Sequence, residues 1–178
     1  MQINLKSYVK TIADWPKKGV FYRDLLPILD NPEAFNEVMA QFTSRYRGKN
    51  IAKIAGIESR GFIFGAALAR ELQLPFIPIR KKGKLPGKTI AKDYELEYGR
   101  DTIEIQEGAV NKGDNVLIID DQLATGGTAL AASQLIEAIH GNVVGFAFVI
   151  NQEYRGGSTR LKKYDVFSLL TYQKENSV

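Results

Sequence analysis

Residues 116–128 combine two kinds of chemical group that would bind opposite parts of a phosphorylated sugar. The segment reads VLIIDDQLATGGT, in which four apolar residues typical of a buried strand lead to Asp120 and Asp121. A glycine-rich loop that opens a helix presents backbone N–H groups, and these bind phosphate. Carboxylates repel phosphate, but they accept hydrogen bonds from hydroxyl groups or lie near a metal. A ligand with a phosphate beside a diol, such as ribose 5-phosphate, would satisfy both halves.

Five consecutive small residues form the predicted phosphate loop: Ala124, Thr125, Gly126, Gly127 and Thr128. The loop contains no lysine, so it is not a Walker A loop, and it lacks the G-x-G-x-x-G spacing of a dinucleotide-binding turn. Such a turn can also merely reverse the chain, and Asp121 can orient the loop rather than contact a ligand. The combination of strand, paired aspartates and loop favours a binding site.

Residues 80–92 carry six positive charges and no negative one, in a chain whose net charge is +4. Nucleic-acid binding is one interpretation of such a run. However, the run lacks the interleaved aromatic residues that single strands stack on. A polyanionic small molecule is therefore the favoured partner, and a solvated basic loop is the remaining alternative.

Composition limits the classes of protein that this chain can belong to. With 178 residues, 44% hydrophobic and 25% charged, it is expected to be one ordinary globular domain. There is no cysteine, which excludes disulfides and thiolate zinc sites. No segment resembles a signal peptide or a membrane span. The expected location is therefore cytoplasmic.

The elements that must position these groups alternate between strand and helix. Apolar residues at helical spacing predict a helix over 5–12, and Pro32 suits the first turn of a helix running to about Arg47. Beyond it we expect strands over 51–57, 75–79 and 143–150, a hairpin over 94–105, a central strand ending at the aspartates, and helices over 62–72 and 128–140. This order predicts an α/β fold with a mostly parallel central sheet flanked by helices. Ligands bind outside the carboxyl ends of such strands.

The phrase 116–128 resembles the phosphoribosyl pyrophosphate motif of the type I phosphoribosyltransferases. Further matching segments follow in the family's order and extend the resemblance over nearly all of residues 12–170: 19–24 (GVFYRD), 58–62 (ESRGF), 80–87 (RKKGKLPG) and 96–99 (LEYG). One departure is Gln122, where the motif usually carries an aliphatic residue. Gln122 is expected to alter loop packing slightly without removing a ligand group.

The resemblance implies a fold, a reaction and partners. The fold would be one domain over 1–178, with a small N-terminal hood over about 1–30 and a flexible β-hairpin flap over about 80–105. The reaction would join adenine to 5-phosphoribosyl-1-pyrophosphate (PRPP), giving AMP and pyrophosphate in purine salvage. Mg²⁺ would be bound mainly through PRPP and water rather than by protein ligands. A homodimer is implied, with some basic groups supplied by the neighbouring subunit, and no nucleic acid or membrane is involved.

The resemblance also assigns roles to individual residues. Glu97 would move a proton at the purine ring, Arg60 would contact that ring, and carboxylates at the ribose, Asp120 among them, would stabilise a cation-like sugar. The remaining substrate contacts would come from the backbone of the hood (Phe21, Tyr22 and Arg23), from the basic run (Arg80, Lys81 and Lys84), from Ser59, Tyr98 and Asp121, and from the phosphate loop.

Several alternatives remain open at this point. Glu97 can instead share a solvated strand face with Glu95, and Phe21 and Tyr22 can simply belong to the core. The same chemistry could serve another purine, hypoxanthine or xanthine. A non-catalytic regulator could also keep the PRPP site as a sensor. Base preference and pyrophosphate release separate these possibilities.

Overall fold

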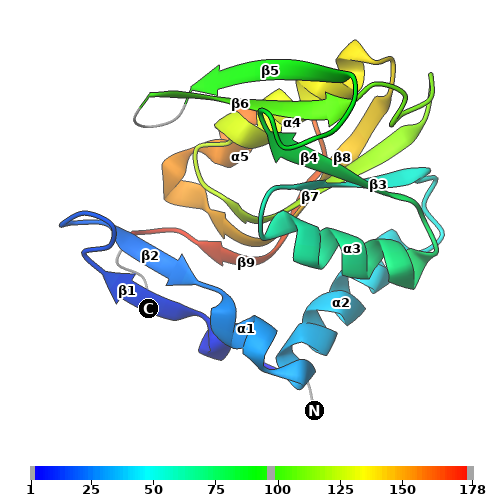
Figure 1. Ribbon diagram of the computed structural model, residues 1–178. Coiled ribbons are helices and arrows are strands. Elements are labelled where there is room, and N and C mark those ends of the chain that lie inside the picture. The colour runs from blue at the N-terminus through cyan, green and yellow to red at the C-terminus, as the bar shows by residue number, and fades with distance from the viewer. Residues whose placement is uncertain (1–2, 96–98, 176–178) are drawn as a thin grey trace.

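A seven-stranded sheet forms the centre of the computed structural model, which describes residues 3–95 and 99–175 (Figure 1). The strand order is β5-β6-β4-β3-β7-β8-β9. Five adjacent strands are parallel: β4, β3, β7, β8 and β9. Strand β6 pairs antiparallel with both β4 and β5. The bounds are β3 Lys53–Ile57, β4 Phe76–Lys81, β5 Thr89–Glu95, β6 Arg100–Gln106, β7 Asn115–Leu123, β8 Asn142–Gln152 and β9 Val166–Tyr172.

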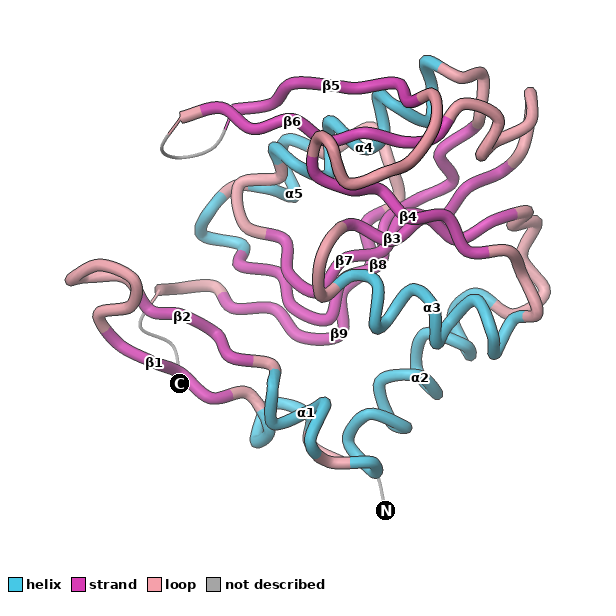
Figure 2. Tube along the Cα trace, in the orientation of Figure 1, coloured by secondary structure: helices cyan, strands magenta, loops and turns pink. Residues whose placement is uncertain are grey.

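Helices cover both faces of the sheet, as the sequence predicts (Figure 2). The longer helices are α2 Pro32–Tyr46, α3 Gly61–Leu72 and α4 Gly127–Ala138. Alternate residues of β7 show the two layers, because Leu117 and Ile119 pack in the cluster that contains α2 and α3. Val116 and Ile118 face the opposite way and pack with α4. This period of two is the geometry of a strand buried on both faces.

The N-terminal segment forms a separate two-stranded antiparallel sheet of β1 Lys10–Ala13 and β2 Phe21–Asp24. A 3-10 helix, Leu5–Tyr8, precedes this sheet, and α1 Leu26–Asp30 follows it. A second short 3-10 helix, Glu153–Arg155, and α5 Gly157–Arg160 lie between β8 and β9. We call residues 3–30 the hood.

The predicted helix over 5–12 is wrong, because most of that segment is a 3-10 turn and a strand. Thr11 and Ile12 are β-branched, which favours extended backbone, and Thr11 pairs with Arg23 across the two-stranded sheet. Pairing with a segment that lies later in the chain therefore overrides the helical spacing of the apolar residues. The strand β2 itself, and β9 at the sheet edge, are absent from the sequence prediction.

Two further boundaries differ from the prediction. The hairpin strand begins at Thr89 rather than at residue 94, because β5 pairs with β6 back to Gln106. The central strand β7 runs past both aspartates to Leu123, since its pairing with β8 continues to that residue. The other predicted strands and helices are confirmed to within a few residues. No helix in the described ranges is both long and apolar enough to cross a bilayer.

Candidate active site

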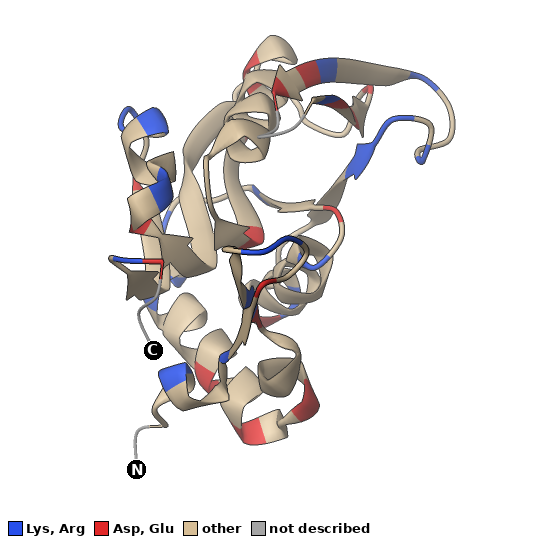
Figure 3. Ribbon diagram, turned by 90° about the vertical axis from the view of Figure 1, so that its left-hand side faces the viewer, with Lys and Arg blue, Asp and Glu red and all other residues tan. Residues whose placement is uncertain are grey.

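The carboxyl ends of β3, β4 and β7 bring the predicted site residues to one edge of the sheet. These three strands are neighbours, with β3 between the other two. Residues 58–60 follow β3, Arg80 and Lys81 end β4, and Asp120 and Asp121 lie in the last part of β7. Figure 3 shows Lys and Arg residues in succession along the loop that leaves β4.

The phosphate loop joins β7 directly to the N-terminus of α4. Gly126 has φ 77°, a left-handed conformation that glycine adopts without strain, and it stands as the residue before the helix. A Cβ at Gly127 would lie 2.7 Å from the Glu95 carbonyl oxygen, so β5 passes too close for any side chain. Gly126 and Gly127 therefore place no side chain over the first N–H groups of α4, and this is what a phosphate site requires.

Asp120 and Asp121 are neighbours with different partners. The Asp121 carboxylate is buried and accepts a hydrogen bond from Arg60 Nε in a close ion pair. Asp120 Oδ1 accepts from the backbone N–H of Asp121 at 2.8 Å. Desolvation raises the pKa of the Asp120 carboxyl above its ordinary value, and the adjacent Asp121 charge adds to this effect. Asp121 thus fixes Arg60, whereas Asp120 is the carboxyl with spare acceptor capacity.

Gly61 allows α3 to approach Asp120. A Cβ there would lie 2.8 Å from Asp120 Oδ1 and 2.9 Å from the Ile119 carbonyl oxygen. The helix that follows β3 therefore packs its first residue against the carboxylate of β7. This contact sets the position of the Asp120 side chain.

Glu58 braces the basic group at the end of β4. Its two carboxylate oxygens accept from Arg80 Nε at 3.1 Å and from Arg80 Nη2 at 3.2 Å. Arg80 Nη1 also donates to the Lys84 carbonyl at 3.0 Å, which ties the following loop to the same guanidinium. The hydrogen bond from Arg80 holds the pKa of Glu58 below its ordinary value. Arg80 is consequently oriented by three hydrogen bonds.

The two predicted lysines and Ser59 are held less firmly. Lys81 Nζ pairs with Asp101 Oδ2 of β6 at 3.0 Å and is half-exposed. The exposed Lys84 is held through its backbone N–H, which donates to Glu104 Oε1 at 3.1 Å. Ser59 is exposed at the turn between β3 and α3. These three side chains lie near the site without being fixed toward its centre.

The hood residues reach the site through β2. Arg60 Nη1 donates to the Tyr22 hydroxyl at 2.9 Å, and the Arg23 carbonyl accepts from Gln122 Nε2 at 2.6 Å. The Arg23 side chain is fully buried and donates to the Glu175 carbonyl at 2.7 Å, so only its backbone faces β7. Phe21 is half-buried at the start of β2.

Sequence reasoning missed several groups at this site. Glu58 lies inside the matched segment 58–62, yet its bond to Arg80 joins residues 22 apart and is not visible as spacing. The expectation for Gln122 was also incomplete, because it bonds the backbone of the hood rather than only packing in the loop. Glu97 and Tyr98 lie outside the described residues, so their predicted roles stay predictions.

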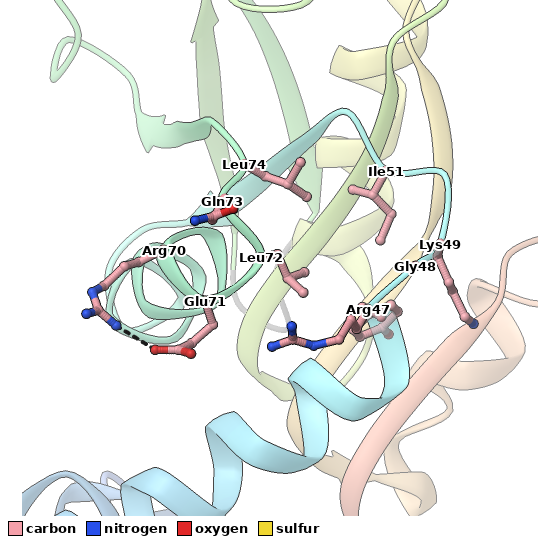
Figure 4. Close-up of a pocket in the computed structure, with 10 residues that line it drawn as sticks. Arg47, Gly48, Lys49, Ile51, Arg70, Glu71, Leu72, Gln73 and Leu74 are labelled. Carbon is pink, nitrogen blue, oxygen red and sulfur yellow. Dashed lines mark hydrogen bonds and ion pairs between the residues drawn. The ribbon is translucent and has the colours of Figure 1, made fainter.

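A hollow elsewhere on the molecule is a weaker candidate. It has a volume of about 580 Å³ and lies between the end of α2, the end of α3 and residues 47–51 (Figure 4). These segments precede β3 and β4, so the hollow lies at the amino ends of the strands. Arg70 there pairs with Glu71 at 2.6 Å. Ligands of α/β sheets bind at the opposite edge.

Comparison with known proteins identifies the family. Residues 26–178 match the phosphoribosyl transferase domain. The chain is 47% identical over 171 residues to the adenine phosphoribosyltransferase of Koribacter versatilis, covering 96% of this chain and 94% of that protein. The chain belongs to the adenine phosphoribosyltransferase family. This is a family of pentosyltransferase enzymes, and the resemblance of the sequence to phosphoribosyltransferases is confirmed.

Solved structures of the adenine phosphoribosyltransferase family share the fold. The enzyme from Thermoanaerobacter pseudethanolicus superposes with a TM-score of 0.91 at 41% identity, covering 94% of this chain and 98% of that one. The Saccharomyces cerevisiae enzyme, solved with adenine and an imino-altritol bisphosphate, gives a TM-score of 0.88 at 39% identity, covering 93% and 96%. The predicted α/β fold with a mostly parallel sheet is therefore confirmed.

Proposed function

We propose that this protein transfers the phosphoribosyl group of PRPP to adenine, forming AMP and pyrophosphate. The observation that carries the proposal is the sheet edge where the aspartates of β7 precede the glycine loop of α4, while Arg80 is held at the end of β4, two strands away. A sugar with phosphate groups at both ends fits this arrangement of acceptors and donors. Support for adenine comes from the yeast relative, whose structure contains that base.

Each end of PRPP would meet a group of the matching kind. The phosphate loop, residues 124–128, would donate N–H groups to the 5-phosphate. Arg80 would bind the pyrophosphate, with Lys81, Lys84 and Ser59 beside it, because a guanidinium fits phosphate oxygens in a two-point contact. Asp120 would accept from the ribose hydroxyls, and Asp121 would hold Arg60 in place.

Departure of pyrophosphate leaves positive charge on the sugar, as in glycoside hydrolysis. The Asp120 carboxylate, when ionised, stabilises that charge electrostatically. Glu97 is proposed to move the proton at the purine ring, with Tyr98 beside it on the flap. The roles proposed for Glu97 and Tyr98 rest on the match of residues 96–99 to the family's segment.

The residues present suit Mg²⁺ as a partner of PRPP rather than as a caged ion. Among residues 3–95 and 99–175, no group of three or more carboxylate or imidazole residues is placed to hold a metal. Asp121 is already paired with Arg60, so Asp120 would be the carboxylate of this pair that is available to an ion beside the ribose. Mg²⁺ prefers such hard oxygen ligands and keeps several waters. When bound through PRPP and water, it neutralises charge on the leaving pyrophosphate.

The base would be read by the hood. The guanidinium carbon of Arg60 lies 5.8 Å from the centre of the Tyr22 ring. The guanidinium therefore lies beside an aromatic side chain of β2. The backbone of Phe21 and Arg23 would then meet the edge of the purine. A backbone carbonyl that accepts from the adenine amino group would disfavour a 6-oxopurine, because that base would leave the acceptor unpaired. The proposal also includes a cytoplasmic location and assembly as a homodimer.

Pyrophosphate release separates an enzyme from a sensor. With adenine and PRPP, the wild-type protein is expected to release pyrophosphate, and Asp120→Asn is expected to reduce turnover by roughly 10²–10³-fold. Asp165→Asn is the matched control, since that aspartate pairs with Arg45 at the surface. Saturable PRPP binding without pyrophosphate release with any purine base would overturn the proposal in favour of a regulator.

A further inference from the structure

Gln122 connects the strand that carries the aspartates to the backbone of the hood. Its Nε2 donates to the Arg23 carbonyl at 2.6 Å across 99 residues of sequence. Its Oε1 accepts from Gln152 Nε2 at 2.8 Å, and Gln152 Oε1 accepts from the Tyr154 hydroxyl at 2.9 Å. This chain of bonds fixes which end of the Gln122 amide faces Arg23, because its oxygen is already turned to Gln152.

The hood is thus tied to the site at two consecutive residues. Tyr22 is held through its hydroxyl by Arg60, and Arg23 is held through its carbonyl by Gln122. Arg60 in turn pairs with Asp121, the residue just before Gln122. Both ties therefore start from the pair of residues that follows Asp120 on β7.

The link is specific to a side chain that can donate a hydrogen bond. An aliphatic side chain at this position would leave the Arg23 carbonyl without this donor. A carbonyl oxygen has two lone pairs, so the bond to Gln122 leaves capacity for a second donor from a ligand. A half-buried amide can thus hold the carbonyl without blocking it.

We propose that Gln122 is a positioning residue for the base, holding the β2 backbone at Arg23 where the purine edge is read. The inference rests on the proposed function and deepens it. The remaining contacts of Arg23 keep the hood folded without Gln122: its side chain bonds Thr11 and Glu175 and lies 4.2 Å from the Tyr172 ring centre. Loss of Gln122 therefore loosens the β2 backbone and leaves the PRPP groups in place.

The test compares Gln122→Met, which keeps the length of the side chain without a donor, and Gln122→Leu, which introduces a branched aliphatic side chain. The expected result is a rise in KM for adenine of about three- to tenfold, the loss of one hydrogen bond, with KM for PRPP unchanged. Gln41→Met is the matched control, because Gln41 on α2 bonds only Glu37 among the described contacts. An unchanged or lower KM for adenine, or equal rises for both substrates, would overturn the inference.

A second readout does not depend on turnover. Trp15 is the only tryptophan of the chain, it is half-exposed, and its ring lies 4.5 Å from that of Tyr22. Quenching of its fluorescence by acrylamide is expected to increase in Gln122→Met and not in Gln41→Met. Gln152→Leu, which frees the Gln122 amide, serves if Gln122→Met fails to fold, and it is expected to show the same change in weaker form.

The two readouts separate this inference from the proposed function. If wild-type protein makes no AMP from adenine, the proposed function fails, whereas increased Trp15 quenching in Gln122→Met would still support the tie between β7 and the hood. If wild-type protein makes AMP and neither KM for adenine nor Trp15 quenching changes in the variant, the function stands and the positioning role is wrong.

Discussion

At the scale of single residues, two adjacent aspartates have different roles because their surroundings differ. Asp120 and Asp121 are adjacent carboxyls, but Asp121 is buried against Arg60, whereas Asp120 lies against the start of α3. The sequence predicts the pair and its nearness to the phosphate loop. It does not predict which aspartate is engaged, because Arg60 lies 61 residues away and reaches Asp121 only through the pairing of β3 with β7.

The raised pKa of Asp120 predicts the acid side of the pH profile. Turnover needs the ionised carboxylate, so kcat/KM is expected to fall on acidification at a higher pH than an ordinary aspartate would give. For stability the sign is opposite: a raised folded pKa stabilises the fold below the unfolded pKa, and this contribution is lost as pH rises through the folded value.

Burial is the main cause of the raised pKa of Asp120, and Asp121→Asn tests the contribution that the adjacent charge adds. Removing the neighbouring charge lowers the pKa of Asp120, so the acidic limb of kcat/KM is expected to move to lower pH. Asp165→Asn is expected to leave the limb in place. A limb that does not move in Asp121→Asn would show that the charge of Asp121 has no influence on the titrating group.

Arg80 is expected to dominate binding of PRPP among the basic residues. Arg80→Gln removes a charge-assisted contact and is expected to raise KM for PRPP by about 10- to 100-fold. It also removes the hydrogen bond that lowers the pKa of Glu58, which is expected to rise toward its ordinary value. Initial rates at varied PRPP measure the first effect. Lys84→Gln is the comparison, and an equal effect of the two substitutions would contradict the role given to the brace by Glu58.

At the scale of elements, a local sequence pattern predicts a helix or strand where pairing with a distant segment does not override that pattern. Pro32 marks the start of α2, and the apolar run before Asp120 marks β7, because both signals lie within the element itself. The strands β1 and β2 depend on each other across a turn, and β9 depends on β8, so their sequences carry weaker signals. The buried Arg23 side chain shows the same limit, since it bonds Glu175 at 152 residues' separation.

The close approach of α3 to β7 gives a prediction at this scale. Gly61→Ala places a methyl group against Asp120 Oδ1, which displaces the Asp120 carboxylate. The variant is expected to lower kcat by about ten- to a hundredfold, because a misplaced carboxylate stabilises the transition state poorly. Gly65→Ala on the same helix is the control, since its Cβ would meet Ile119 Cγ2 and the Phe76 ring instead. Both variants are expected to lose about 1–3 kcal/mol of stability through overpacking. Equal loss of kcat in both would contradict the placement of Asp120 by α3.

At the scale of the whole molecule, β5 and the hood are far apart in sequence, yet both contact residues between Gln122 and Gly127. The end of β5 passes over Gly127, and β2 is tied to Gln122. The order of motifs along the chain predicts which segments belong to the site. Their contacts could not be predicted, because the pairing of distant strands decides them.

A homodimer is the molecular-scale expectation. Sedimentation is expected to give about twice the 19.8 kDa of one chain. If flap residues of a neighbouring subunit complete each site, specific activity falls on dilution below the dimer dissociation constant. A monomer that retains full specific activity would contradict this arrangement.

The central claim, transfer of phosphoribosyl to adenine, is tested most directly by offering adenine, hypoxanthine and xanthine at equal concentration with PRPP and Mg²⁺. The nucleotides formed and the pyrophosphate released would be measured in the same sample. The account predicts AMP as the dominant product, in one-to-one ratio with pyrophosphate. Preference for a 6-oxopurine, or PRPP binding with no nucleotide formed, would contradict it.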